Sequence, residues 1–447
     1  MDSSILESTE IKKWKCLICG VIFEGPEPPS TCPVCGADSS QFIEVKETTD
    51  GFKNSSSNKF VIIGNGAAGL NAAESIRNRN EKADIKIVSE ENCITYYRPE
   101  LSKCLSTDME EAKFYVKNEK WYADNNIDLI LNTSVKNIFP TSKKILLQNN
   151  EELSYDKLII ANGSVSFIPP INGTDKEGVF TLKFIKDANT IRSYIDKSKS
   201  AVIVGGGLLG LEAAWEIKKS GLSVTVVEFS NRLLPRQLDD EGAVIFKKSI
   251  DKSGVEIILG DSVEEITGSE KVSGVRLKSG KSIAADIVLF SVGIRPNKQL
   301  AESAGIKTDK GIMVNDKMET SLKDIYACGD ICEYNGKVYG NWPAAVEMGK
   351  IAGANSSGEE SIFSSFVSSV IFSSMNSNLF SCGIFSPELK NISYSDQSKG
   401  EYLKLFFDDD KLAGGILLGD TSKSGKIMLA IQNGRILADI LKDNFLT

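Results

Sequence analysis

The 447-residue chain contains no histidine. This absence removes the side chain that most often acts as a general base near neutral pH, and also the usual nitrogen ligand of zinc. Any chemistry must therefore depend on cofactors, carboxylates, lysines or cysteines.

An excess of positive charge and long apolar runs are also missing. The 52 Lys and Arg residues are outnumbered by 60 Asp and Glu, so the net charge is −8, which disfavours nucleic acid because phosphate binding needs a dense basic face. No apolar run approaches the ~18 residues of a membrane span, and residues 1–7 lack the basic and apolar regions of a signal peptide. These absences predict a cytoplasmic protein with neither a membrane nor a nucleic acid as partner.

Nine cysteines are present, and four of them form two Cys-x-x-Cys-Gly segments, here called knuckles. In a cytoplasmic chain, cysteines favour metal or redox use over structural disulfides. Four thiolates at this spacing predict one tetrahedral site, which suits either zinc or iron. A unit this small, with Trp14, Phe23 and Phe42 for its core, needs its metal to fold. The predicted ligands are Cys16, Cys19, Cys32 and Cys35.

A buried strand, a glycine-rich turn, a helix and a second strand ending in an acid occur twice in the chain. In this context each GxGxxG pattern is strong evidence for a dinucleotide site, and the alternative is a glycine turn without a ligand. The glycines let a pyrophosphate approach the helix N-terminus, and the acid binds ribose hydroxyls. The two predicted sets are Gly64, Gly66, Ala68, Gly69 and Glu90, and Gly205, Gly207, Gly210 and Glu228.

Glu228 also bears on the choice of nucleotide. A carboxylate accepts hydrogen bonds from the ribose 2′-hydroxyl and repels a 2′-phosphate, which favours NADH over NADPH. Arg232, four residues further on, is the argument for the opposite choice.

Four further runs occur in a fixed order: YYRPELSK at 96–103, ANG at 161–163, VGIRPN at 292–297 and IYACGD at 325–330. With the two fingerprints, they resemble the pyridine-nucleotide:disulfide oxidoreductase superfamily over about residues 59–350. Within it, the chain is most similar to NAD(P)H:rubredoxin reductases and to the flavoprotein part of NADH-nitrite reductases. The resemblance implies an α/β fold with two Rossmann-like, three-layer ββα-type domains and a small C-terminal α+β domain.

The resemblance also implies cofactor roles. The first fingerprint would bind FAD and the second NAD(H), with Asp330 and Gly329 closing the FAD site and Arg98 and Pro99 lining it. Ala161, Gly163 and Gly293 complete the implied cofactor-binding set.

Two catalytic residues are implied as well. Lys103 would lie near the flavin ring, where a positive charge stabilises the negative charge of the reduced ring. Glu212 would face the nicotinamide and the flavin and pair with Lys103. The alternatives are a solvated surface lysine and a carboxylate that serves the helix dipole.

The cysteine segment resembles a rubredoxin of the short form found in rubrerythrins, because only twelve residues separate the two knuckles. Next to a flavin–NADH enzyme this favours iron, since zinc is redox-inactive and would leave the fusion without a purpose in electron transfer. The predicted organisation is a rubredoxin-like Fe(Cys)4 module at 10–45, a polar linker at 46–58, an FAD-binding domain at 59–176 and 297–358, an NAD(H)-binding domain at 177–296, and a C-terminal domain at 359–447.

These observations predict an NADH-dependent flavoprotein that passes electrons through FAD to its own iron centre and on to a redox protein. By family analogy alone, that acceptor would be a rubredoxin-dependent oxygen or peroxide reductase. Two alternatives stay open: a peroxide or disulfide reductase that uses Cys104, and a flavin reductase with a zinc-ribbon docking module. Cys104 has no partner at the Cys-x₄-Cys spacing, and the first glycine loop lacks the histidine of the peroxidase branch, so we expect Cys104 to be a packing residue.

Overall fold

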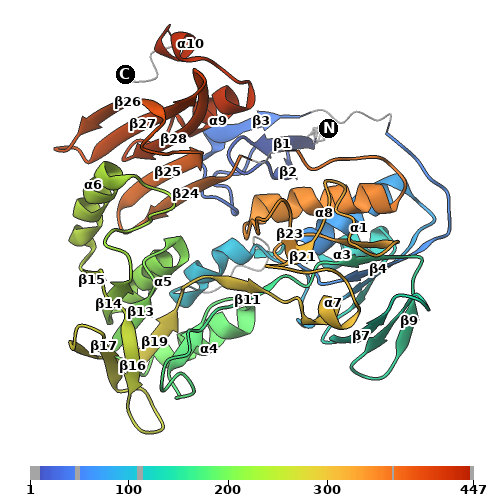
Figure 1. The fold of residues 1–447 in the computed structure, drawn as a ribbon, viewed down its shortest axis with the longest axis horizontal. Coiled ribbons are helices and arrows are strands. Elements are labelled where there is room, and N and C mark those ends of the chain that lie inside the picture. Colours follow the sequence, from blue (N-terminus) through green and yellow to red (C-terminus); the bar gives the residue numbers. More distant parts are fainter. Residues whose placement is uncertain (1–10, 46–50, 108–113, 365–366, 443–447) are drawn as a thin grey trace, which may run out of the picture.

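The computed structural model describes residues 11–45, 51–107, 114–364 and 367–442. These residues form two parallel sheets with helices beside them, an antiparallel C-terminal sheet and a small N-terminal sheet (Figure 1). This architecture confirms the predicted fold class. No helix in the described part of the chain is long and apolar enough to cross a membrane.

The N-terminal cysteine module is a three-stranded antiparallel sheet of order β2-β1-β3. The rings of Phe23 and Phe42 meet edge to face with centroids 5.8 Å apart, and Trp14 Nε1 donates to the carbonyl of Gly25 at 3.1 Å. The predicted aromatic core is therefore present. The elements are β1 (Lys12–Cys16), β2 (Ile22–Gly25), the 3-10 helix η1 (Ser39–Gln41) and β3 (Phe42–Glu44).

The first Rossmann-like domain is built on a parallel sheet of order β22-β10-β4-β5-β6, whose strand β22 comes from much later in the chain. Residues 60–63 of β4 are buried, as expected for a parallel strand covered on both faces. Helices α1 and α8 pack closely, because a Cβ atom at Gly349 would lie 2.3 Å from the carbonyl oxygen of Ala68. The elements are β4 (Lys59–Ile63), α1 (Ala67–Arg79), β5 (Asp84–Val88), β6 (Ile127–Ile130), β10 (Lys157–Ile160), β22 (Ile325–Ala327) and α8 (Trp342–Ser356).

Smaller elements complete this domain. An antiparallel sheet of order β7-β8-β9 provides the further layer of the ββα-type fold, and two short strand pairs, β11–β20 and β21–β23, lie in the connections. The elements are η2 (Arg98–Leu105), α3 (Glu119–Asp124), β7 (Val135–Phe139), β8 (Lys144–Leu147), β9 (Glu152–Ser154), β11 (Ser164–Ser166), β20 (Ile294–Pro296), α7 (Gln299–Ser303), β21 (Ile312–Met313) and β23 (Cys332–Glu333).

The second Rossmann-like domain repeats the plan with a parallel sheet of order β12-β19-β13-β14-β15 and an antiparallel sheet of order β16-β17-β18. Its elements are β12 (Val179–Thr181), α4 (Ile185–Ile195), β13 (Ser200–Val204), α5 (Leu208–Lys219), β14 (Ser223–Glu228), α6 (Asp240–Ile250), η3 (Asp251–Ser253), β15 (Glu256–Leu259), β16 (Val263–Thr267), β17 (Gly274–Leu277), β18 (Ser282–Ala284) and β19 (Ile287–Phe290).

The C-terminal domain is an antiparallel sheet of order β24-β25-β28-β27-β26 with two helices. It is fastened to the second Rossmann-like domain at Asp239, which accepts hydrogen bonds from Tyr402 Oη at 2.7 Å and Lys404 Nζ at 2.8 Å. The cysteine module lies beside this sheet (Figure 1). The elements are β24 (Ser369–Ser374), β25 (Ser377–Gly383), β26 (Lys390–Asp396), β27 (Glu401–Asp408), β28 (Lys411–Leu418), α9 (Ser424–Gln432) and α10 (Leu437–Lys442).

Candidate functional site

A cavity of about 1200 Å³ lies at the carboxyl ends of β4, β5, β10 and β22, where open parallel sheets bind their ligands. Both Rossmann-like domains, the C-terminal domain and the cysteine module contribute to its walls. The predicted site residues that line it are Gly64, Gly66, Ala68, Glu90, Arg98, Pro99, Lys103, Ala161, Gly163, Glu212, Gly293, Gly329, Asp330, Cys19 and Cys35. The other predicted residues lie outside this lining: Gly69, Gly205, Gly207, Gly210, Glu228, Cys16 and Cys32.

The first glycine loop has one position that is open and two that are closely packed. A Cβ atom at Gly64 would lie 2.3 Å from the carbonyl oxygen of Ala161, and one at Gly69 would lie 1.9 Å from that of Gly64. A Cβ atom at Gly66 would meet nothing within 4 Å, and Gly66 caps α1 without a side-chain hydrogen bond. Gly66, Ala67 and Ala68 line the cavity, so the N-terminus of α1 has the room that a pyrophosphate requires.

Two buried polar atoms beside this loop have no hydrogen-bond partner among the described residues. They are Nδ2 of Asn65 and Oδ1 of Asn162, and both residues line the cavity. Buried polar groups are normally paired, so these atoms indicate that a polar ligand completes the site. The open loop and the unpaired atoms fit FAD.

The second glycine loop has the same construction. Gly205 has a φ of 110°, a Cβ atom at Gly210 would lie 2.2 Å from its carbonyl oxygen, and Gly207 is open. Glu228 accepts hydrogen bonds from the backbone N–H groups of Gly206 at 2.7 Å and Ser230 at 2.8 Å. The glycines of this loop do not line the cavity. Helix α5 begins at the loop and reaches the cavity, where Leu208, Leu209 and Glu212 form part of the wall.

Arg98 is held by several groups at the start of η2. Its Nη2 donates to Glu91 Oε1 at 2.6 Å, and its guanidinium lies 4.8 Å from the ring centroid of Tyr96 and 5.2 Å from that of Phe184. Glu90, the predicted ribose ligand, is exposed at the cavity wall. The first acid of the pair is thus free to face a ligand, while the second positions the arginine.

Lys103 and Glu212 both line the cavity but do not pair with each other. Lys103 Nζ lies 2.8 Å from Glu100 Oε1, and its side chain is 55% exposed. Glu212 Oε2 instead accepts a hydrogen bond from Ser102 Oγ at 3.0 Å. Burial raises the pKa of Glu212 to about 7, and the Ser102 hydrogen bond and the Lys103 charge offset this only in part. The expected Lys103–Glu212 ion pair is therefore replaced by two different contacts, because Glu100 lies one turn from Lys103 on the same helix.

Asp330 belongs to a hydrogen-bonded group that the motifs did not indicate. Its Oδ2 accepts from Ser164 Oγ at 2.9 Å and from Lys183 Nζ at 3.3 Å, and Lys183 Nζ also donates to Ser164 Oγ at 2.8 Å. Gly329 has a φ of 85°, and a Cβ atom there would lie 2.9 Å from that of Ala68, so this position needs glycine. Lys183 was missed because no local pattern distinguishes it.

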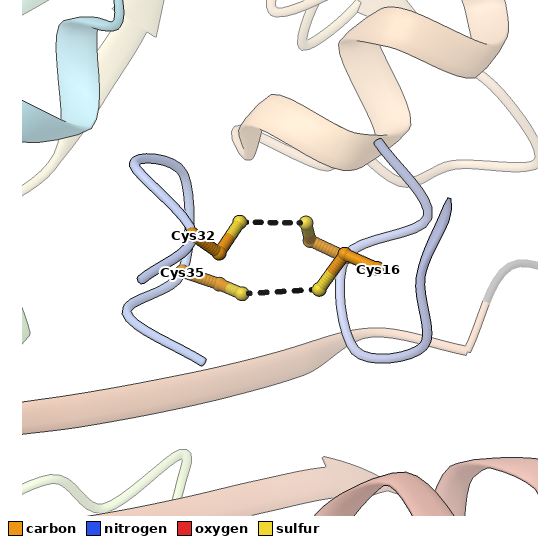
Figure 2. A group of neighbouring side chains, drawn as sticks. Cys16, Cys32 and Cys35 are labelled. Carbon is orange, nitrogen blue, oxygen red and sulfur yellow. Dashed lines mark hydrogen bonds between the residues drawn. The ribbon is translucent and has the colours of Figure 1, made fainter. Parts of the chain in front are cut away.

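The two knuckles bring their four sulfurs together (Figure 2). The Sγ atoms lie within 4.8 Å of one another, with 3.7 Å between Cys16 and Cys35 and 3.6 Å between Cys19 and Cys32. The glycine that follows each knuckle, Gly20 or Gly36, has φ near 75°, a value that glycine adopts without strain. Four converging thiolates fit a tetrahedral iron or zinc ion.

The metal site and the nucleotide cavity are joined. Cys19 and Cys35, the second cysteine of each knuckle, line the cavity, whereas Cys16 and Cys32 are fully buried inside the module. Tyr97 lies between the two sites, with its ring centroid 6.2 Å from that of Phe23 in the module and 5.8 Å from that of Trp342 in the cavity wall. Burial raises the pKa of Tyr97.

Cys104 lies in a buried cluster of apolar side chains. It is buried, its Sγ donates to the carbonyl of Glu100 at 3.4 Å, and burial raises the pKa of its thiol to about 11. A raised pKa disfavours the thiolate that nucleophilic chemistry needs.

The fold and the cavity together define an oxidoreductase with two nucleotide-binding domains. A pyridine nucleotide-disulphide oxidoreductase match covers residues 58–349. The chain belongs to this family. Two further matches lie on either side of it: a rubrerythrin, rubredoxin-like domain at 14–43, and a rubredoxin NAD+ reductase C-terminal domain at 369–435. Membership implies FAD and NADH as cofactors, and the four cysteines can hold iron.

Similar proteins are known from bacteria. The chain is 31% identical to the NADH-rubredoxin oxidoreductase of Clostridium acetobutylicum, over 86% of this chain and 97% of that protein. The crystal structure of the C. acetobutylicum NADH:rubredoxin oxidoreductase superimposes with a TM-score of 0.72 at 30% identity, covering 87% of this chain and 100% of that one. A nitrite reductase [NAD(P)H] of Bacillus subtilis is 35% identical over 87% of this chain, but the chain spans about half of that protein's length, 49%.

Proposed function

We propose that this enzyme passes electrons from NADH through FAD into its own four-cysteine centre, loaded with iron, and from there to a separate redox protein. When bound, FAD takes a hydride from NADH and gives up electrons singly, and a ferric ion held by four thiolates takes one electron at a time. Each NADH yields NAD+, one proton and two electrons, so the single metal centre would be used twice for each NADH.

One observation carries this proposal. Cys19 and Cys35 line the same cavity as Gly64, Gly66 and Asp330. A metal centre with a purely structural role does not need to lie beside a nucleotide cavity. The shared cavity, and the 31% identity to an NADH-rubredoxin oxidoreductase, favour electron transfer between the two sites.

The chain's own residues would hold FAD as follows. The open N-terminus of α1 would face the pyrophosphate, and Glu90 would accept from the ribose. Asp330, with Ser164 and Lys183, would close the opposite side, while Arg98 and Pro99 fix the wall between them. Lys103, on the exposed surface of η2, would place its charge toward the reduced ring.

The nicotinamide end would be organised by α5. Glu228 would bind the ribose at one end of the second fingerprint, and Glu212 would face the nicotinamide in the cavity. The carboxylate of Glu212 would favour the positive charge that the ring gains when it loses a hydride.

A peroxide or disulfide reductase that uses Cys104 has less support. The thiol is buried and is not part of the cavity lining in the described residues. We expect Cys104→Ser to keep the rate of NADH-dependent dye reduction within about twofold, as for a packing residue. A loss of peroxide- or disulfide-dependent NADH oxidation in this variant would favour that alternative.

The identity of the bound metal tests the proposal. Metal analysis and a visible spectrum of protein purified from its natural source should show one iron per chain, beside one FAD. Native-source protein is needed because recombinant expression can load zinc at a four-thiolate site. Stoichiometric zinc would contradict the electron-transfer role and favour the docking alternative.

A further inference from the structure

The cysteine module is fastened to the C-terminal domain through Gln41. This side chain is only 5% exposed and lies at the N-terminus of α9. Its Oε1 accepts from the backbone N–H of Gly425 at 2.8 Å and from Ser424 Oγ at 3.3 Å. Its Nε2 donates to the carbonyl of Ser422 at 3.0 Å. One buried amide thus satisfies groups at a helix end that would otherwise lack partners.

Strand β24 holds the other side of the module. Ser369 Oγ donates to the carbonyl of Ile18, inside the first knuckle, at 2.7 Å. A Cβ atom at Gly36, at the end of the second knuckle, would lie 3.8 Å from Ile371 Cγ2. The C-terminal domain therefore contacts both knuckles without touching a metal ligand through these groups.

These contacts set the orientation of the metal site. With Gln41 on α9 and both knuckles on β24, Cys19 and Cys35 line the cavity, while Cys16 and Cys32 are fully buried. We propose that the C-terminal domain is a dock for the chain's own rubredoxin-like module, that Gln41 and the N-terminus of α9 form its latch, and that the docked module keeps separate rubredoxins off the cavity. This inference deepens the proposed function and rests on it.

The docked module excludes a separate rubredoxin because it already occupies one edge of the cavity. Cys19, Val34, Cys35 and Gly36 form one edge of the cavity. A second rubredoxin would have to place its own cysteines at that edge to reach the flavin, and the same space cannot hold two modules. A separate rubredoxin therefore gains access to the cavity only after the latch opens.

Gly425 offers a direct way to open the latch. A Cβ atom there would lie 2.4 Å from Gln41 Oε1 and 3.2 Å from Leu17 Cδ1. Gly425→Leu would place a larger side chain where the module sits, and leucine favours the helical conformation that α9 already has. Gln41→Ala removes the latch from the module side and leaves all four cysteines in place. Gln432→Ala, at an exposed position of α9, is the matched control.

The first readout is structural and independent of electron transfer. In hydrogen exchange of the metal-loaded, FAD-loaded chain, amides in 14–25 and in 367–374 should exchange at least about tenfold faster in Gly425→Leu than in the unmodified protein. Gln41→Ala should show a smaller increase, and Gln432→Ala none. Unchanged exchange in both latch variants would overturn the dock.

The second readout is kinetic. Reduction of the module's iron by NADH should slow at least about tenfold in Gly425→Leu, while an added separate rubredoxin should be reduced faster than by the unmodified chain. Dye reduction should stay within twofold in all variants. If the unmodified chain does not reduce its own iron, the proposed function fails, although hydrogen exchange still tests the dock. If it does, and Gly425→Leu behaves identically toward both acceptors, the dock is wrong.

Discussion

Two glutamates in the second Rossmann-like domain have the same side chain in different surroundings. Glu228 accepts hydrogen bonds from the backbone N–H groups of Gly206 and Ser230 at the second glycine loop. Glu212 lies against the cavity wall, where burial raises its pKa to about 7. Glu228 is therefore placed to recognise a ribose, and Glu212 is suited to a charge that changes near neutral pH.

Glu228 should decide the choice of nucleotide. Arg232 forms an ion pair with Asp240, so its charge is already engaged. We expect kcat/KM for NADH to exceed that for NADPH by at least about tenfold, and Glu228→Gln to reduce this ratio about tenfold by removing repulsion of the 2′-phosphate. Steady-state kinetics with both nucleotides is the measurement. A clear NADPH preference in the unmodified protein would show that Arg232 or another cation binds the phosphate.

Glu212 should give NADH-dependent dye reduction a pH dependence. Below pH 7 its carboxyl is mostly protonated, and above pH 7 it is ionised and can stabilise the positive nicotinamide, so the rate should rise through about pH 7. Ser102→Ala removes a hydrogen bond that favours the carboxylate, and should move the midpoint to higher pH. Glu212→Gln should remove this transition. A profile that is the same in all three proteins would show that another group titrates.

At the scale of the element, the first glycine fingerprint, which spans the start of α1, combines an open position with a packed one. Gly66 meets nothing within 4 Å, whereas a side chain at Gly69 would collide with the backbone of Gly64. Substitutions at Gly66 and at Gly69 should therefore have different effects on the protein.

Gly66→Val should fold but fail to bind FAD, because its side chain fills the space of the pyrophosphate. It should keep the spectrum of the metal module and lose all NADH-driven reduction. Gly69→Val should instead lower the melting temperature of the FAD-free protein, since the loop must move. Flavin content, circular dichroism and thermal unfolding separate the two. Full FAD occupancy in Gly66→Val would mean that the pyrophosphate lies elsewhere.

The elements that local sequence specifies were predictable. Short sequence segments encode both strand–turn–helix units with their acids, and also the two knuckles. Each feature depends on the conformation of glycines or on the spacing of side chains along the chain. Contacts between distant segments were not predictable. Lys183 reaches Asp330 across 147 positions, and Gln41 reaches Gly425 across 384. Only the packing of domains brings such pairs together.

The linker is a second case in which contacts between distant segments could not be predicted from the sequence. The polar composition of 46–58 predicted a linker between the cysteine module and the first Rossmann-like domain. Of this segment, residues 46–50 lie outside the described part. In the rest, Asn54 N donates to the carbonyl of Arg79 at 2.7 Å, and Asn54 Nδ2 to that of Ser357 at 2.9 Å. Composition alone could not reveal these bonds to the first Rossmann-like domain, nor the contacts that hold the module on the C-terminal domain.

At the scale of the molecule, loss of the metal site should interrupt electron flow after the flavin. Cys32→Ser removes one of four thiolates, so the module should lose its metal and its fold together. The variant should still bind FAD and reduce a dye with NADH, and it should reduce a protein acceptor only when a separate rubredoxin is added. Cys93→Ser, outside the metal site, is the control. Loss of dye reduction with FAD still bound would mean that the module takes part in the NADH–flavin step.

In the proposed pathway, the electron passes inside one chain, from the nucleotide cavity to the docked cysteines. The most direct measurement is anaerobic mixing of the iron- and FAD-loaded protein with NADH, following the visible absorption of the ferric thiolate centre over a tenfold range of protein concentration. We expect bleaching with a first-order rate constant that does not change with protein concentration. A rate constant that rises in proportion to protein concentration, or an iron centre that stays oxidised while a dye is reduced, would contradict it.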